Sequence, residues 1–104
     1  IPNLVTIRPA DASETAEAWK VALSRAEGPT ALVLTRQKLG FIDRTAHAPA
    51  AGLARGAYVL KDADGGAPDV VLLSSGSEVA LALDAAKRLA GEGIRARAVS
   101  VPSM

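Results

Sequence analysis

The chain has 104 residues, enough for one small domain, and its 12 basic and 11 acidic residues leave a net charge of +1. Balanced charge and a 3% share of aromatic residues argue against a nucleic-acid partner, which requires clustered basic side chains and stacking platforms. The absence of cysteine excludes disulfides and cysteine metal sites, and it fits the reducing cytoplasm in which we expect the protein. No apolar run approaches the roughly 18 residues of a membrane span, so no membrane partner is expected.

The sequence of the first third predicts a β-α-β unit, which begins with a strand followed by the start of a helix. Residues 4–8 form a short, mostly apolar run that Pro9 closes, which is typical of a strand. Asp11 and Glu14 have the spacing of a capping box with Asp as the cap. This spacing predicts a helix that begins near Ala12.

The rest of the unit follows from helical and strand periodicity. We expect the helix to end at Gly28-Pro29, because glycine stops a helix and proline breaks it. Four apolar residues at helical spacing form its expected buried face: Ala16, Trp19, Leu23 and Ala26. Residues 30–35 are a nearly continuous apolar run, which predicts a strand buried on both faces of a parallel sheet.

The last third repeats this architecture. Residues 69–74 predict another buried strand, and Ser77 can cap a helix that runs to about Ala90. Two glycines end that helix: Gly91 and Gly93. Residues 94–101 alternate partly between apolar and polar side chains, which favours either a strand at the sheet edge or a strand covered less fully on one face.

The middle of the chain, residues 36–68, is rich in glycine, proline and alanine, and only residues 57–60 resemble a strand there. About twenty residues without regular structure argue against one compact domain. We therefore predict an α/β protein with two partial three-layer, parallel-sheet domains, residues 1–44 and 68–104, joined by a linker over residues 45–67.

Several features indicate that the chain is part of a longer polypeptide. It has no initiator methionine, and its only methionine is the last residue, Met104. Its N-terminus lacks the charged start and apolar core of a signal peptide. Each predicted β-α-β unit is too short to bury a core alone, so we expect each to be one edge of a larger domain.

Arg36 is the strongest candidate site residue, because it directly follows the apolar run 30–35. Ligands of open α/β sheets bind at the carboxyl ends of the strands. An arginine there offers five donors in a planar fork that matches a phosphate or a carboxylate. From the pattern alone, however, a solvated or salt-bridged arginine at a strand end explains the residue better than a ligand site.

The remaining candidates have simpler structural explanations. The turn 75–78 could bind an anion at a helix N-terminus, but one glycine is not a phosphate-binding pattern, and capping explains the turn better. Asp11 and Glu14 could form a carboxylate pair for acid–base chemistry, yet their spacing is that of a cap, and Arg8 could pair with Asp11. We expect three isolated side chains to face solvent: Lys38, Arg44 and His47.

Five short motifs, taken together, resemble one known family. They are Ile-Arg-Pro-Ala-Asp at 7–11, Leu-Val-Leu-Thr-Arg-Gln at 32–37, Gly-Ala-Tyr-Val-Leu at 56–60, Gly-Ser-Glu-Val at 76–79 and Ala-Val-Ser-Val-Pro at 98–102. In this order and at about this spacing they are similar to transketolases, and the resemblance covers essentially the whole chain. One departure is that Leu39 precedes Gly40, where the family usually has proline.

The resemblance implies a position within a much longer enzyme. Residues 1–44 would be the end of the domain that binds the pyrimidine of thiamine diphosphate, residues 45–67 the interdomain linker, and residues 68–104 the start of the C-terminal domain. Thiamine diphosphate and Mg²⁺ or Ca²⁺ would be bound by the intact enzyme, and none by residues of this chain. The implied partners are sugar phosphates, the remainder of the transketolase chain and a second copy in a homodimer.

The resemblance also implies one site residue and a reaction. The arginine of the Thr-Arg-Gln motif in transketolases contacts the phosphate of the sugar substrate, and it corresponds to Arg36. His47 matches no active-site motif, and no catalytic residue is expected in the chain. The reaction would transfer a two-carbon ketol unit from a ketose phosphate to an aldose phosphate, with this chain alone inactive. The alternatives are a related thiamine-diphosphate synthase of the dihydroxyacetone or deoxyxylulose type and a non-enzymatic α/β binding module.

Overall fold

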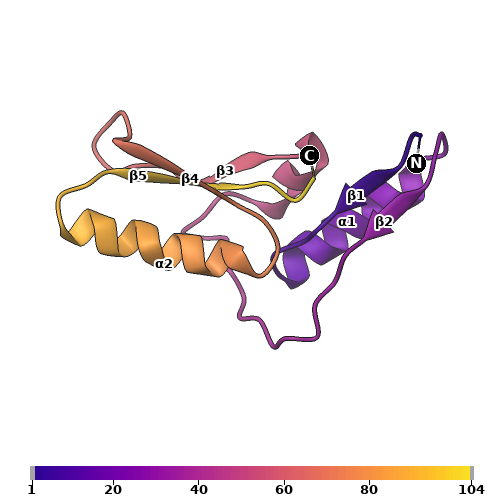
Figure 1. Cartoon of the computed structure of the whole chain (residues 1–104), viewed down its shortest axis with the longest axis horizontal. Helices are drawn as coiled ribbons and strands as arrows, with labels where there is room; N and C mark the ends of the chain where they lie inside the picture. The colour runs from indigo at the N-terminus through magenta and orange to yellow at the C-terminus, as the bar shows by residue number, and fades with distance from the viewer. Residues whose placement is uncertain (1, 104) are drawn as a thin grey trace.

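Two β-α-β units lie at opposite ends of an elongated molecule, which measures 46 × 28 × 24 Å, in the computed structural model (Figure 1). The structure describes residues 2–103. Each unit contains a pair of parallel strands, so the predicted α/β class with two parallel-sheet units is confirmed. The strands form two separate sheets, one with the order β1-β2 and one with the order β3-β5-β4.

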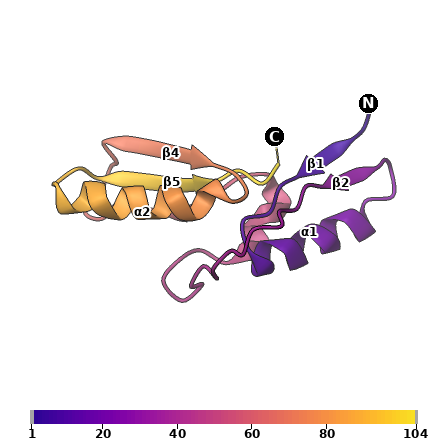
Figure 2. The ribbon, with the colours of Figure 1, turned by 60° about the horizontal axis from the view of Figure 1, so that its bottom comes forward.

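The first unit consists of β1 (Val5–Ile7), α1 (Ala12–Ser24) and β2 (Thr30–Leu32). The two strands are parallel, and α1 lies alongside them (Figure 2). The helix begins where the capping spacing predicts, because the Asp11 side chain accepts a hydrogen bond from the Glu14 N–H. It ends at Ser24, so the prediction that it continues to Gly28-Pro29 is wrong.

The buried face of α1 is not the predicted one. The four residues expected to be buried are all exposed, with Trp19 at 52% and Leu23 at 81% exposure. The helix instead buries Glu14 and Ala18, and Ala18 packs with Ile7 of β1. The small alanine side chain lets the helix approach the sheet closely, whereas nothing in residues 2–103 covers the side with Trp19.

The apolar run 30–35 is only partly a strand, because β2 ends at Leu32. The Val33 N–H still donates to the Ile7 carbonyl at 2.8 Å, but the side chains of Val33 and Leu34 are 46% and 57% exposed. The prediction of a strand buried on both faces is therefore wrong for the described residues. An apolar strand pattern reflects burial in the whole protein, and these residues supply only part of that burial.

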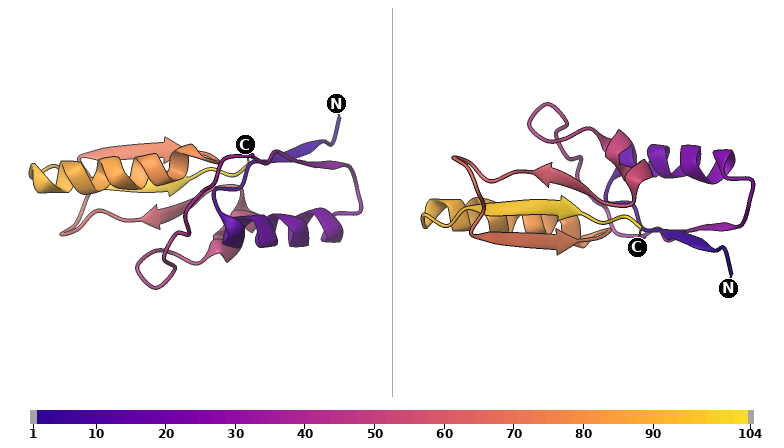
Figure 3. Two further views of the ribbon diagram at one scale, coloured as in Figure 1. Left: turned by 90° about the horizontal axis from the view of Figure 1, so that it is seen from below. Right: turned by 90° about the horizontal axis from the view of Figure 1, so that it is seen from above.

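The second unit consists of β4 (Val70–Ser74), α2 (Glu78–Gly91) and β5 (Ala96–Ser100), preceded by β3 (Tyr58–Lys61). β4 and β5 are parallel, and β3 adds to the other side of β5 in the antiparallel direction (Figure 3). β5 is therefore the central strand, so the edge alternative for residues 94–101 is wrong and the one-sided covering is confirmed.

α2 covers one face of this sheet, and the other face is open within residues 2–103 (Figure 1). The alternation of exposure along the strands shows this directly, because Val71 and Leu73 on β4 are 45% and 69% exposed. The predicted burial of residues 69–74 on both faces is thus wrong here, as it is for β2. α2 ends at Gly91, and Gly93 adopts a φ of 82°, so the predicted glycine stop is confirmed.

The segment between the units is ordered by packing on both of them. It contains a 3₁₀ helix, η1 (Ala50–Arg55), whose Leu53 joins Ile7 and Ala18 in the core of the first unit. The larger core combines residues of both units and of this segment: Ala10, Ile42, Tyr58, Leu60 and Val79. Gly52 makes this packing possible, since a Cβ there would lie 2.6 Å from the Tyr58 ring.

Candidate functional site

Arg36 lies in an exposed bend after the carboxyl end of β2. β1 and β2 are parallel, so both carboxyl ends lie at the same edge of their sheet, the edge at which α/β proteins bind ligands. No hydrogen bond or ion pair joins the Arg36 side chain to any other residue in the range 2–103. Within the described residues the guanidinium is therefore not salt-bridged. It is a solvated arginine at a strand end, as one of the two structural explanations expects, and its donors are free for a ligand.

A small pocket of about 170 Å³ opens at this edge. Thr35, the neighbour of Arg36, lines it, and the pocket also reaches the turn before α2 of the second unit. Its lining comes from both units: Arg8, Pro9, Val33, Leu34, Thr35, Gly76 and Ser77. The fold thus brings two of the sequence candidates, the Thr-Arg-Gln motif and the turn 75–78, to one place.

Arg8 lies across the turn 75–78. Gly76 has a φ of 58°, and a Cβ on it would lie 2.6 Å from Arg8 Nε, so glycine is required for this approach. Arg8 Nη2 is 2.8 Å from Glu78 Oε2, so the predicted pairing of Arg8 with Asp11 is wrong. Ser77 makes no side-chain capping bond either, so the predicted cap is wrong. The Glu78 and Val79 N–H groups donate to the Ser75 and Gly76 carbonyls.

Behind this edge lies a buried polar network, called here the Glu14 cluster: Asp11, Glu14, Arg44, Tyr58 and Ser100. The Glu14 side chain is fully buried. Its Oε2 accepts hydrogen bonds from the Tyr58 hydroxyl at 2.6 Å and the Ser100 hydroxyl at 2.8 Å. Its Oε1 accepts from the Ala10 N–H at 3.1 Å, so the capping box closes one residue earlier than the standard pattern.

Asp11 and Arg44 complete the Glu14 cluster. Asp11 Oδ1 accepts from the Glu14 N–H at 2.9 Å and from Arg44 Nη2 at 3.0 Å, while Oδ2 accepts from the Ile42 N–H at 3.2 Å. Arg44 Nη1 donates to the Tyr58 hydroxyl and to the Ala48 carbonyl, both at 2.9 Å. The prediction that Arg44 faces solvent is therefore wrong, since its side chain is only 18% exposed.

The protonation of the cluster follows from its burial. Burial raises the pKa of Tyr58, and the hydrogen bond to Glu14 raises this pKa further, so the phenol stays protonated and keeps donating. Burial lowers the pKa of Arg44, but the bond to Tyr58 and the charge of Asp11 outweigh it, so the net shift is upward. Each of the two carboxylates accepts three hydrogen bonds from within the chain, which argues against acid–base chemistry and for a structural role.

Sequence reasoning missed Tyr58 and Ser100. They lie 44 and 86 residues from Glu14 along the chain, so no local spacing connects them. The sequence offered only a weak indication of their role, because a tyrosine or a serine that is buried on a strand needs a polar partner but its position does not say which one.

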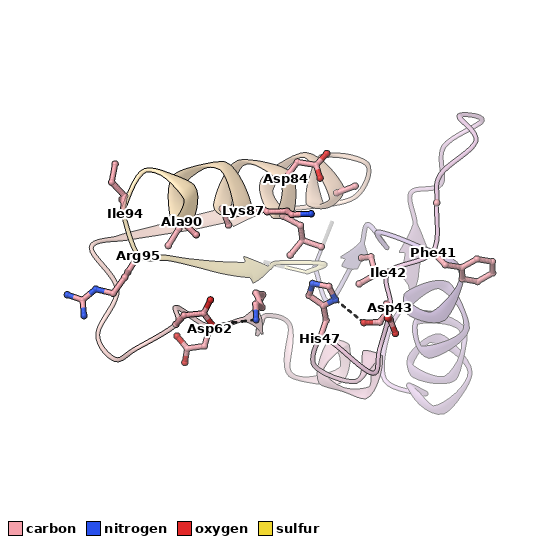
Figure 4. Close-up of a pocket in the computed structure, with 18 residues that line it drawn as sticks. Phe41, Ile42, Asp43, His47, Asp62, Asp84, Lys87, Ala90, Ile94 and Arg95 are labelled. Carbon is pink, nitrogen blue, oxygen red and sulfur yellow. Dashed lines mark hydrogen bonds and ion pairs between the residues drawn. The ribbon is translucent and has the colours of Figure 1, made fainter.

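A second, larger groove of about 820 Å³ lies beside α2 (Figure 4). Leu83, Lys87 and Ala90 line it from the helix, and His47 lines it from the opposite side. His47 Nδ1 is 2.8 Å from the Asp43 carbonyl oxygen, and nothing else in the described chain engages the ring. Within residues 2–103 no three His, Cys, Asp or Glu side chains gather as a metal site, and no helix has the length and apolarity to cross a membrane.

Comparison with known proteins places both units in one family. Residues 1–41 match the family described as "Transketolase, pyrimidine binding domain", and residues 56–104 match "Transketolase-like TK C-terminal domain". The transketolase of Bacillus subtilis is 52% identical over 104 residues, which are 100% of this chain and 16% of that protein. The chain thus spans about one sixth of the length of this curated relative.

Solved structures agree with the sequence matches. The transketolase of Leishmania mexicana superposes with a TM-score of 0.88 at 45% identity, over 99% of this chain and 14% of that one. A Pichia stipitis transketolase in complex with sedoheptulose-7-phosphate superposes with a TM-score of 0.86 at 38% identity, again over 99% and 14%. Because both units match transketolase domains in sequence and the chain as a whole superposes on transketolase structures, this chain belongs to the transketolase family.

Proposed function

We propose that the chain forms the junction between the pyrimidine-binding and C-terminal domains of a transketolase. The enzyme transfers a two-carbon ketol unit from a ketose phosphate to an aldose phosphate. Residues 1–44 and 68–104 belong to the two domains, and residues 45–67 join them. The proposal is supported by the order of the two family matches and by relatives solved with sugar phosphates, such as the Pichia stipitis enzyme with sedoheptulose-7-phosphate.

The observation that carries the site is the guanidinium of Arg36, which lies at the carboxyl edge of a parallel sheet and has no partner among residues 2–103. Its role is to hold the phosphate of the sugar substrate through two charge-assisted hydrogen bonds. This phosphate is remote from the reacting carbon, and its binding energy orients that carbon. In this proposal Arg36 is a binding residue and not a catalytic one.

Thiamine diphosphate and Mg²⁺ or Ca²⁺ are part of the proposal for the whole enzyme. Thiamine diphosphate supplies the electron sink of the ketol transfer when it is bound. The described residues contain no cluster of three metal-binding side chains, so we assign the metal ion to other parts of the enzyme, and we propose the same for thiamine diphosphate. We also propose that other parts of the enzyme cover the exposed apolar faces of α1 and of the second sheet. These parts include a second copy of the enzyme in a cytoplasmic homodimer.

The test uses a full-length chimera in which this chain replaces the matching segment of the Bacillus subtilis relative. The kcat/KM is measured for xylulose 5-phosphate and for xylulose, with one unphosphorylated aldose acceptor. We expect Arg36→Ala to lower kcat/KM about 100-fold for xylulose 5-phosphate and less than threefold for xylulose. Lys38→Ala is the matched control, an exposed cation on the same segment, and it should change neither value by more than about twofold. Equal losses for both donors with Arg36→Ala would exclude the phosphate role.

A further inference from the structure

Arg36 lies on a segment that, within residues 2–103, is hydrogen-bonded to the rest of the structure only at its two ends. The last bond to the first sheet is from the Val33 N–H to the Ile7 carbonyl at 2.8 Å. The next is from the Ile42 N–H to Asp11 Oδ2 at 3.2 Å, and Ile42 is also the first buried side chain after β2. In between, the Gln37 N–H donates to Thr35 Oγ1, a bond within the segment itself. Figure 1 shows this segment as a long excursion between β2 and η1.

The far end of the segment depends on one carboxylate. Asp11 binds the Ile42 N–H with Oδ2 and Arg44 Nη2 with Oδ1. Asp11 has a fixed position, because its side chain is 1% exposed and caps α1 directly after the carboxyl end of β1. The same side chain thus connects the edge of the sheet where Arg36 emerges with the place where its segment returns to the core.

We propose that Asp11 is a positioning residue for Arg36: it fixes the returning end of the phosphate-binding segment. A segment fixed at both ends samples fewer positions, so less conformational entropy is lost when Arg36 binds a phosphate. Releasing the Ile42 end lets the segment sample positions in which the guanidinium is misplaced, and the apparent affinity falls with the fraction of competent molecules. This inference rests on the phosphate role proposed for Arg36.

The Glu14 cluster contains a matched control for this role. Ser100 donates its single side-chain hydrogen bond to Glu14, and its side chain forms no hydrogen bond with residues 34–44. Ser100→Ala therefore removes a buried bond of the same cluster and leaves both bonds of Asp11 to the segment in place. Asp11→Asn keeps the size of the side chain but removes the charge that holds Arg44. Its amide donor faces either the Ile42 N–H or the pair formed by the Glu14 N–H and Arg44 Nη2.

The experiment uses the full-length chimera and the two donors described above. The measured quantity is the ratio of kcat/KM for xylulose 5-phosphate to kcat/KM for xylulose. We expect Asp11→Asn to lower this ratio about 5- to 30-fold, chiefly through KM for the phosphorylated donor, and Ser100→Ala to leave it within twofold. Partial unfolding removes active enzyme equally for both donors, so it cancels in the ratio.

A double substitution separates this inference from the proposed function. In an Arg36→Ala background, Asp11→Asn should lower the ratio no further, because the group that it positions is absent. A normal ratio in Asp11→Asn, with a selective loss in Arg36→Ala, would overturn the positioning role and leave the phosphate role intact. An unselective Arg36→Ala would overturn the phosphate role itself. A further loss of ratio in the double variant would show that Asp11 acts on the phosphate by another route, which also contradicts the inference.

Discussion

The two β-α-β units share a topology but fix the starts of their helices by different physical means. In α1 the acidic residue of the first turn, Glu14, is fully buried and accepts three hydrogen bonds from outside the helix, two of them from distant strands. In α2 the corresponding acidic residue, Glu78, lies at the surface and forms one ion pair with Arg8. The apolar Val79, 1% exposed, anchors that helix instead.

This difference shows where the junction between the units obtains its specificity. Apolar packing at Val79 is tolerant of small shifts, whereas the bonds of Glu14 require Tyr58 and Ser100 at fixed distances. Both of these partners come from the second sheet, on β3 and β5. The start of α1 therefore fixes how the second unit sits against the first through directional bonds, while the start of α2 reaches the first unit through an exposed ion pair with Arg8 and the apolar packing of Val79.

The largest expected effect on stability comes from Glu14→Ala, which is compared with Glu78→Ala at the start of the other helix. Glu14→Ala leaves the Tyr58 and Ser100 hydroxyls without an acceptor and should lower the free energy of unfolding by about 3–5 kcal/mol. Glu78→Ala removes a solvent-exposed ion pair and should cost about 0.5 kcal/mol or less. Urea unfolding followed by circular dichroism measures both, and similar costs would remove the distinction between the two helix starts.

The second prediction concerns the turn before α2, which contacts Arg8 of the first unit. Gly76→Ala places a Cβ 2.6 Å from Arg8 Nε on a residue with a φ of 58°, so we expect a loss of about 1–3 kcal/mol. Gly40→Ala is the matched control, because no atom lies within 4 Å of the added Cβ and its φ is not positive. It should be neutral or slightly stabilising in the same unfolding experiment. A neutral Gly76→Ala would show that the Arg8 contact is easily displaced.

The third prediction tests the protonation of the Glu14 cluster. The pKa of Tyr58 is raised above its ordinary value of 10.0, first by burial and then by its bond to Glu14. Its contribution to stability is therefore complete below pH 10 and is lost as the pH rises toward the folded-state pKa. Tyr58 is the only tyrosine in the chain, so absorbance of the phenolate reports on it alone.

We expect phenolate to form in one step with unfolding, above the pH at which a free tyrosine titrates. Tyr58→Phe should cost about 1–2 kcal/mol at neutral pH, because it leaves Glu14 and Arg44 each without one partner, and it should weaken the loss of stability above pH 10. Titration of Tyr58 at its ordinary pKa in the folded protein would contradict the burial of its hydroxyl.

Sequence patterns predicted the order of the helices and strands and two of the helix ends, but they predicted the junction poorly, for a physical reason. The Asp11 cap and the Gly93 stop depend on residues a few positions apart, and both are confirmed. The partners of Glu14 are set by the packing of two units, so capping spacing explained Glu14 but did not predict its burial. Arg44 was missed similarly: an isolated arginine in a loop is normally solvated, and only the fold brings Asp11 to it.

The apolar patterns were misleading where the described chain lacks the covering element. Trp19 and Leu23 have the spacing of a buried helix face, yet they are exposed, while the opposite side of α1 packs on the sheet. Val71 and Leu73 on β4 likewise belong to an apolar run that predicts burial, yet they are exposed. Periodicity predicts which residues will be buried, but it does not say whether the same stretch of chain supplies the cover.

The smallest effect on stability, and the last prediction, concerns that exposed face of α1. Trp19→Gln should change the free energy of unfolding by less than about 0.5 kcal/mol, because half of the side chain is already exposed to water. It should nevertheless reduce self-association of the 104-residue chain, measured by sedimentation velocity, since an apolar face without cover promotes association. Lys20→Gln, an exposed change on the next residue, is the control and should leave association unchanged. Trp19 is also the only tryptophan, so its emission should resemble that of solvated indole in this chain and shift to shorter wavelength if another element of the intact enzyme covers it.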